Sequence, residues 1–95
     1  MKSLKVSAET DPGGLAGAIA STLRNGEEVE LLSVGAGALN QAVKAVVLAK
    51  GFLSKEGRDI AMEPDFLLVE IEGKERTAID MHVFEILPEE ELKAG

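Results

Sequence analysis

Two successive strand-to-helix transitions constrain this sequence more than any other feature. The strand-like segments are Leu4–Ala8, which alternates apolar and polar residues, and Val29–Val34, which is rich in valine and leucine. Apolar residues recur at helical spacing in Leu15–Arg24 and again in Leu39–Leu53. Because a strand–helix–strand unit favours parallel strands joined by a right-handed crossover, we expect an α/β domain.

The residues between these segments are typical of helix ends. Asp11 can cap the first helix, with Pro12 at its first position, and Asn25-Gly26 is suited to a left-handed C-terminal cap. Gly35-Ala36-Gly37 stands where the second strand turns into the second helix. The free N–H groups at such a helix start attract anions such as phosphate, so this turn is the best candidate ligand feature.

The second helix carries two adjacent apolar strips. We predict that its larger apolar residues form one packing face and that a strip of small residues beside it allows close packing on a sheet or helix. The first set is Leu39, Val43, Val46 and Val47, and the second is Ala38, Ala42, Ala45 and Ala49.

The second half of the chain predicts a β-hairpin. Arg58–Met62 fits either a third strand, interrupted by Pro64, or an extended lead-in. Apolar residues then alternate in 67–71 and in 79–83, and Gly73-Lys74 between them fits a type II′ turn. The expected order is therefore β-α-β-α-β-β, a two-layer α+β arrangement with a mixed sheet and two helices on one face.

Apolar residues occur on both faces of the predicted hairpin. We expect one face to carry Leu67, Val69, Ile71, Ile79, Met81 and Val83, and the other Phe66, Leu68, Phe84 and Ile86. Unless the hairpin extends past the sheet, one of these sets needs a covering partner, and a homodimer provides one. Residues 1–86 form the expected domain and residues 87–95 an acidic tail.

Composition excludes several classes of function. The chain lacks cysteine and has one histidine, which excludes disulfides, thiolate zinc sites and histidine metal clusters. Three phenylalanines are its only aromatic residues, so a platform that stacks bases on aromatic rings is not expected. A net charge of −7 argues against general coating of DNA. Without a visible signal peptide or membrane span, the expected compartment is the cytoplasm.

Four segments resemble a known family. The main one is Gly35-Ala36-Gly37-Ala38-Leu39-Asn40-Gln41-Ala42-Val43-Lys44-Ala45, which looks like the signature of the stage V sporulation protein S family. Leu4-Lys5-Val6-Ser7-Ala8, Leu15-Ala16-Gly17-Ala18 and Gly73-Lys74-Glu75-Arg76-Thr77-Ala78-Ile79 agree in order and spacing. The similarity spans roughly residues 2 to 86.

The resemblance implies an Alba-like fold, a dimeric habit and a role as a nucleic-acid-binding regulator without catalytic residues or cofactors. In Alba-type proteins three regions contact nucleic acid, and here they correspond to Ala8–Gly14, Gly35–Lys44 and Glu72–Thr77. Both DNA and RNA fit such contacts. Because the molecule as a whole is acidic, we expect the affinity to be modest and strongly salt-dependent.

Eight residues are the candidate nucleic-acid contacts: Lys5, Gly35, Gly37, Asn40, Gln41, Lys44, Lys74 and Arg76. Each has a structural alternative. The glycines can serve a tight turn alone, and Lys74 and Arg76 can pair with Glu72 or Glu75 across the hairpin. His82 fits a structural or interfacial role better than a catalytic one.

Two other functions remain open at this point. One is a protein-interaction or assembly module without nucleic-acid binding, built on the alanine strip and the two-sided apolar hairpin. The other is a site for a small anion at Gly35–Gly37.

Overall fold

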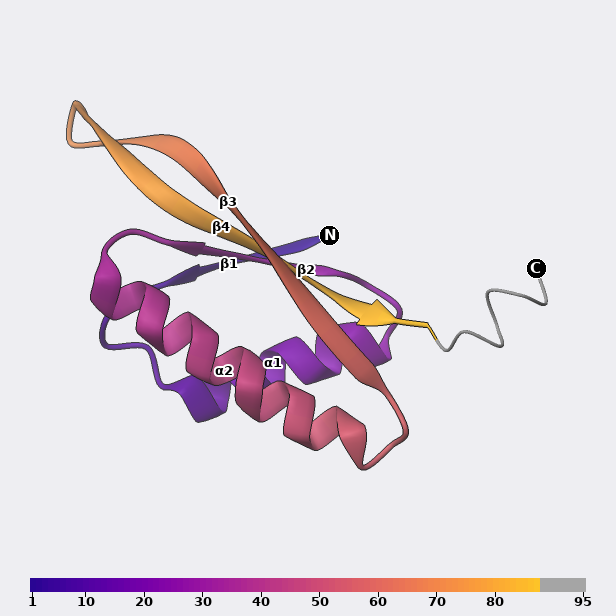
Figure 1. Cartoon of the computed structure of the whole chain (residues 1–95). Coiled ribbons are helices and arrows are strands. Elements are labelled where there is room, and N and C mark those ends of the chain that lie inside the picture. Colours follow the sequence, from indigo (N-terminus) through magenta and orange to yellow (C-terminus); the bar gives the residue numbers. More distant parts are fainter. Residues whose placement is uncertain (88–95) are drawn as a thin grey trace.

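The structure is a computed structural model, and it describes residues 1–87 (Figure 1). The predicted order β-α-β-α-β-β is confirmed. The elements are β1 (Lys2–Val6), α1 (Pro12–Arg24), β2 (Val29–Ser33), α2 (Ala36–Ser54), β3 (Asp59–Ile71) and β4 (Lys74–Ile86). Of the expected acidic tail, residues 88–95 lie outside the described residues.

The four strands form one mixed sheet in the order β1-β2-β4-β3. β1 and β2 are parallel, as expected for strands joined by a helix, whereas β4 is antiparallel to both of its neighbours. Both helices cover the same face of the sheet, and the opposite face, here called the open face, is not covered by them (Figure 1). The two-layer α+β architecture expected for an Alba-like fold is therefore confirmed.

The core lies between the helices and the central strands. Its fully buried side chains come from α1, β2, α2 and β4, and the largest are Ile19, Val29, Leu31, Leu53, Met81 and Val83. In α2 the predicted alanine strip is fully or almost fully buried. Val47, predicted to lie on the packing face, is instead 63% exposed, because the alanines bring the helix close to the sheet and turn Val47 outward.

Local interactions explain the element ends. The Asp11 carboxylate accepts hydrogen bonds from the backbone N–H groups of Gly13 and Gly14, at 3.3 and 3.1 Å, which confirms the predicted cap. β1 ends at Val6, earlier than predicted, because the Ser7 N–H donates to Thr10 Oγ1 at 2.8 Å and so starts a turn.

The hairpin differs from its prediction in two respects. Its turn is Glu72-Gly73, one residue earlier than expected, and both residues have positive φ, at 52° and 77°, as a type I′ turn requires. β3 also continues through Pro64 without interruption. An edge strand tolerates proline because one side of it needs no backbone donor, and β3 is an edge of the sheet.

The observed register also corrects the predicted faces of the hairpin. Phe66 pairs with Ile79 and Leu67 pairs with Ala78, so the apolar residues of β3 and β4 group differently from the prediction. The helix side carries Met62, Phe66, Leu68, Ile79, Met81 and Val83. The open face carries Leu67, Val69, Ile71, Phe84 and Ile86. Within residues 1–87, no helix is both long and apolar enough to cross a membrane.

Candidate nucleic-acid interface

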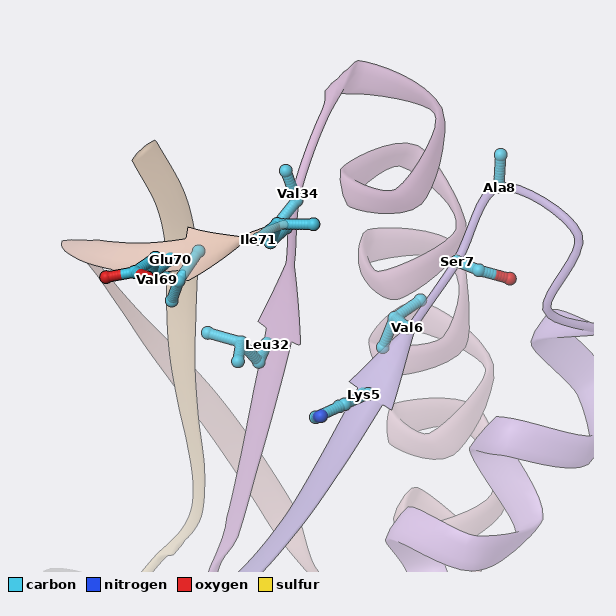
Figure 2. Close-up of a pocket in the computed structure, with 9 residues that line it drawn as sticks. All are labelled: Lys5, Val6, Ser7, Ala8, Leu32, Val34, Val69, Glu70 and Ile71. Atoms are coloured by element: carbon cyan, nitrogen blue, oxygen red, sulfur yellow. The ribbon is translucent and has the colours of Figure 1, made fainter. Parts of the chain in front are cut away.

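A cleft of about 400 Å³ opens between the hairpin and the ends of β1 and β2. Figure 2 shows it, with Val69 and Ile71 on the hairpin facing Leu32 on β2 and Val34, which follows β2. Its lining residues are Lys5, Val6, Ser7, Ala8, Leu32, Val34, Val69, Glu70 and Ile71. The cleft thus gathers the end of β1, the residue before the α2 turn and the tip region of the hairpin.

Unequal strand lengths create this cleft. β3 and β4 have 13 residues each, whereas β1 and β2 have five. β2 pairs with β4 only from Ile79 to Val83, so Lys74–Ala78 and the β3 residues opposite them project beyond the sheet. The projecting half of the hairpin extends past the same end of the sheet at which α2 starts (Figure 1).

The hairpin separates its charges between its two faces. Arg76 lies opposite Val69 and Lys74 opposite Ile71, so both cations point to the face that lines the cleft. Glu70 lies opposite Glu75 on the other face. Although Glu70 contributes to the cleft rim, its carboxylate is directed away from Leu32 in Figure 2.

Lys5 supplies a cation from the sheet. It is the register partner of Leu32 in the parallel β1–β2 pair, and its exposed side chain lies on the open face. Among residues 1–87, no carboxylate forms an ion pair with Lys5, Lys74 or Arg76. The alternative in which Lys74 and Arg76 pair across the hairpin is therefore absent from this part of the chain.

Other cations are engaged away from the cleft. Arg24 contacts Glu56 at 2.7 Å, Lys50 contacts Asp59, and Arg58 is 3.5 Å from Glu85. The hydrogen bond from Arg24, aided by its charge, lowers the pKa of the Glu56 carboxyl.

Each glycine at the start of α2, Gly35 just before the helix and Gly37 in its first turn, has a local structural role. Gly35 has a φ of 92°, in the left-handed region that side chains avoid. At position 37 a Cβ would lie 3.0 Å from the Ala8 Cβ, so glycine allows the β1–α1 loop to approach. Both residues are exposed, and Gly35 offers no side-chain cap to the helix.

The remaining α2 candidates divide between structure and surface. The side-chain amide of Gln41 donates to the backbone oxygens of Ala8 and Thr10, both at 3.2 Å, and so ties α2 to the β1–α1 loop. Asn40 is exposed. Lys44 is exposed too, but it lines a separate hollow with Pro12, Val43, Val47 and Leu48 and is not among the cleft residues.

Acidic groups occupy the open face farther along β4. Burial, followed by a hydrogen bond and charge repulsion from Glu30 and by the charge of Asp65, raises the pKa of the Asp80 carboxyl. His82 Nε2 lies 2.6 Å from Glu28 Oε1, and its ring packs against Phe84, with centroids 5.0 Å apart. These contacts agree with the structural role expected for His82.

Sequence reasoning missed the aliphatic lining of the cleft. The Val29–Val34 segment carries apolar residues on both faces, since Leu31 is buried in the core while Leu32 and Val34 line the cleft. That two-sided pattern was the available signal.

Comparison with known protein families identifies the family of this chain. A family model described as Stage V sporulation protein S matches residues 2–86, which are nearly all of the described residues. The match includes β1, both helices and the whole hairpin. The chain belongs to the stage V sporulation protein S family.

Proposed function

We propose that this protein is a non-enzymatic regulator that binds nucleic acid at the cleft. The observation that carries the proposal is that three cations are free of ion pairs with residues 1–87: Lys5, which lines the cleft, and Lys74 and Arg76, which share the hairpin face of the cleft residues Val69 and Ile71. Cations that are already neutralised by a neighbouring carboxylate attract phosphate weakly, whereas free cations release bound counterions when they meet it. Membership in a family named for sporulation supports a role related to sporulation.

The electrostatic arrangement reconciles binding with the acidic composition. β4 carries Lys74 and Arg76 at its projecting end and Asp80 farther along the same face. A phosphate backbone would therefore contact the projecting end and be repelled by the acidic region. The exposed start of α2 adjoins the cleft through Val34, and Gly35, Gly37 and Asn40 would extend the contact there.

We also propose that the protein is a homo-oligomer. On the helix side of β3, Phe66 and Leu68 are 76% and 64% exposed, and Val47, Leu48 and Phe52 are exposed on α2. Apolar surface of this kind is typical of a protein interface. A symmetric dimer would bury it and leave the open face, with its cleft, free.

A titration of labelled RNA and DNA, single- and double-stranded, by fluorescence anisotropy at low salt tests the proposal. We expect saturable binding by the wild-type protein and at least a tenfold loss for the double variant Lys74→Glu/Arg76→Glu, since each reversal replaces attraction by repulsion. The matched control is Lys50→Glu/Arg58→Glu, which changes net charge equally but alters cations already held by acids. Equal losses in both double variants would contradict a localised site.

The second candidate function is an assembly module without nucleic-acid binding. The exposed apolar surface on β3 and α2 favours it, because that surface requires no nucleic acid. An oligomer that binds none of the four nucleic acids at low salt would establish this alternative over the proposal.

A further inference from the structure

We infer that the cleft takes an unpaired nucleobase of a single strand, held between aliphatic side chains while its phosphates meet the surrounding cations. This inference rests on the proposed function and specifies which form of nucleic acid the site accepts. It concerns the interior of the cleft, whereas the proposed function concerns the cations around it.

The shape and lining of the cleft suit a flat, apolar ring. Its volume of about 400 Å³ falls within the range of small-ligand sites, which are mostly apolar with a few placed polar groups. Leu32 and Val34 form one side, and Val69 and Ile71 form the other (Figure 2). Extruded bases are held in other proteins between apolar as well as aromatic side chains, so the scarcity of aromatic residues is no obstacle.

Charge complementarity selects a nucleotide over a neutral apolar ligand. Lys5 lies inside the cleft, and Lys74 and Arg76 share the hairpin face that carries Ile71 and Val69. A base between the aliphatic walls therefore has cations on both the sheet side and the hairpin side for its flanking phosphates.

A duplex does not satisfy this arrangement. Its bases are stacked and paired, so one can enter the cleft only after the unstacking energy has been supplied, whereas an unpaired base enters without that cost. Apart from Lys5, the polar residues that line the cleft are Ser7 and, at the rim, Glu70, whose carboxylate is directed away from Leu32. With so few hydrogen-bonding groups, the cleft should accept different bases with modest preference.

The test uses the full-length protein and a short single-stranded oligonucleotide containing one 2-aminopurine. Val69→Trp fills the cleft, whereas the control Gly17→Trp adds the same side chain on the exposed side of α1, where a Cβ meets no atom within 4 Å. We expect Val69→Trp to weaken single-strand binding about tenfold, in line with the loss of one held base, and to abolish the 2-aminopurine fluorescence change. Gly17→Trp should bind like wild type, and replacing every base of the oligonucleotide by an abasic site should weaken wild-type binding similarly.

The outcomes separate this inference from the proposed function. Equal affinity for a duplex of the same sequence, together with an unaffected Val69→Trp variant, overturns base insertion while nucleic-acid binding stands. Absence of binding to any nucleic acid overturns both. Thermal unfolding of both tryptophan variants establishes that each is folded, and neither position is part of the core.

Discussion

The slope of log affinity against log salt concentration should report how many cations of the site contact phosphates. Lys5 lines the cleft, Lys74 and Arg76 share the hairpin face of its residues Val69 and Ile71, and none of the three is paired with an acid of residues 1–87. For single strands, the slope of log affinity against log salt is about −0.7 for each neutralised phosphate, so three contacts give a slope of about −2. Arg76→Gln should reduce its size by about 0.7.

This difference is measurable over an ordinary salt range. From about 50 to about 200 mM salt, wild-type affinity should fall about 18-fold and that of Arg76→Gln about 7-fold. The assay is anisotropy at several salt concentrations with an oligonucleotide short enough to reach one cleft. Using a short strand prevents two subunits of an oligomer from contributing to one slope.

Arg24→Gln is the matched control. It removes the same charge, but Arg24 is held by Glu56 at 2.7 Å and lies at the end of α1, away from the cleft. Its slope should equal that of wild type. If both variants reduce the slope equally, binding depends on total charge, and the argument from unpaired, cleft-facing cations is refuted.

Two further predictions concern assembly and stability. Phe66→Glu should shift the oligomer towards monomer in sedimentation velocity, whereas Leu67→Glu, on the opposite face of β3, should not; identical behaviour would exclude the helix side as the interface. Asp80→Asn should raise stability at neutral pH by about 1 kcal/mol, or about 4–8 °C in Tm, since the folded state now holds an unpartnered buried carboxylate oxygen beside Glu30 and Asp65. Because folding raises the pKa of Asp80, wild-type stability should fall as pH rises through the interval between the ordinary and the folded-state pKa of this carboxyl group. Below that interval Asp80 is protonated in both states, so the stability gained by Asp80→Asn should vanish there. Thermal melts recorded at a series of pH values measure this dependence. A gain independent of pH would assign the effect to packing instead.

The fold was predictable because its signals are local. Asp11 caps its helix with adjacent amides, and the alternation of β2 and β4 follows directly from burial on one face. The hairpin turn was misplaced because Gly73 was assigned to the first turn position, whereas Glu72 occupies it with a positive φ. A non-glycine residue with positive φ is uncommon, so sequence preference favoured the wrong register.

The candidate site was less predictable because it depends on tertiary geometry. The cations Lys74 and Arg76 were found, but their common face with Val69 and Ile71 follows only from the observed register. Gln41, expected to meet a ligand, instead binds backbone oxygens more than 30 residues earlier in the chain. No local pattern reports a contact over that separation.

The length of the hairpin has a mechanical consequence. Beyond Ile79 its two strands are hydrogen-bonded only to each other, and a lone two-stranded ribbon is weakly held in water. The ribbon can therefore bend about its root near Ile79 while the helices and central strands keep their packing. Bending of the ribbon would change the separation of Val69 and Ile71 from Leu32 on β2 without disturbing the core, which would suit a site proposed to accept bases of unequal size.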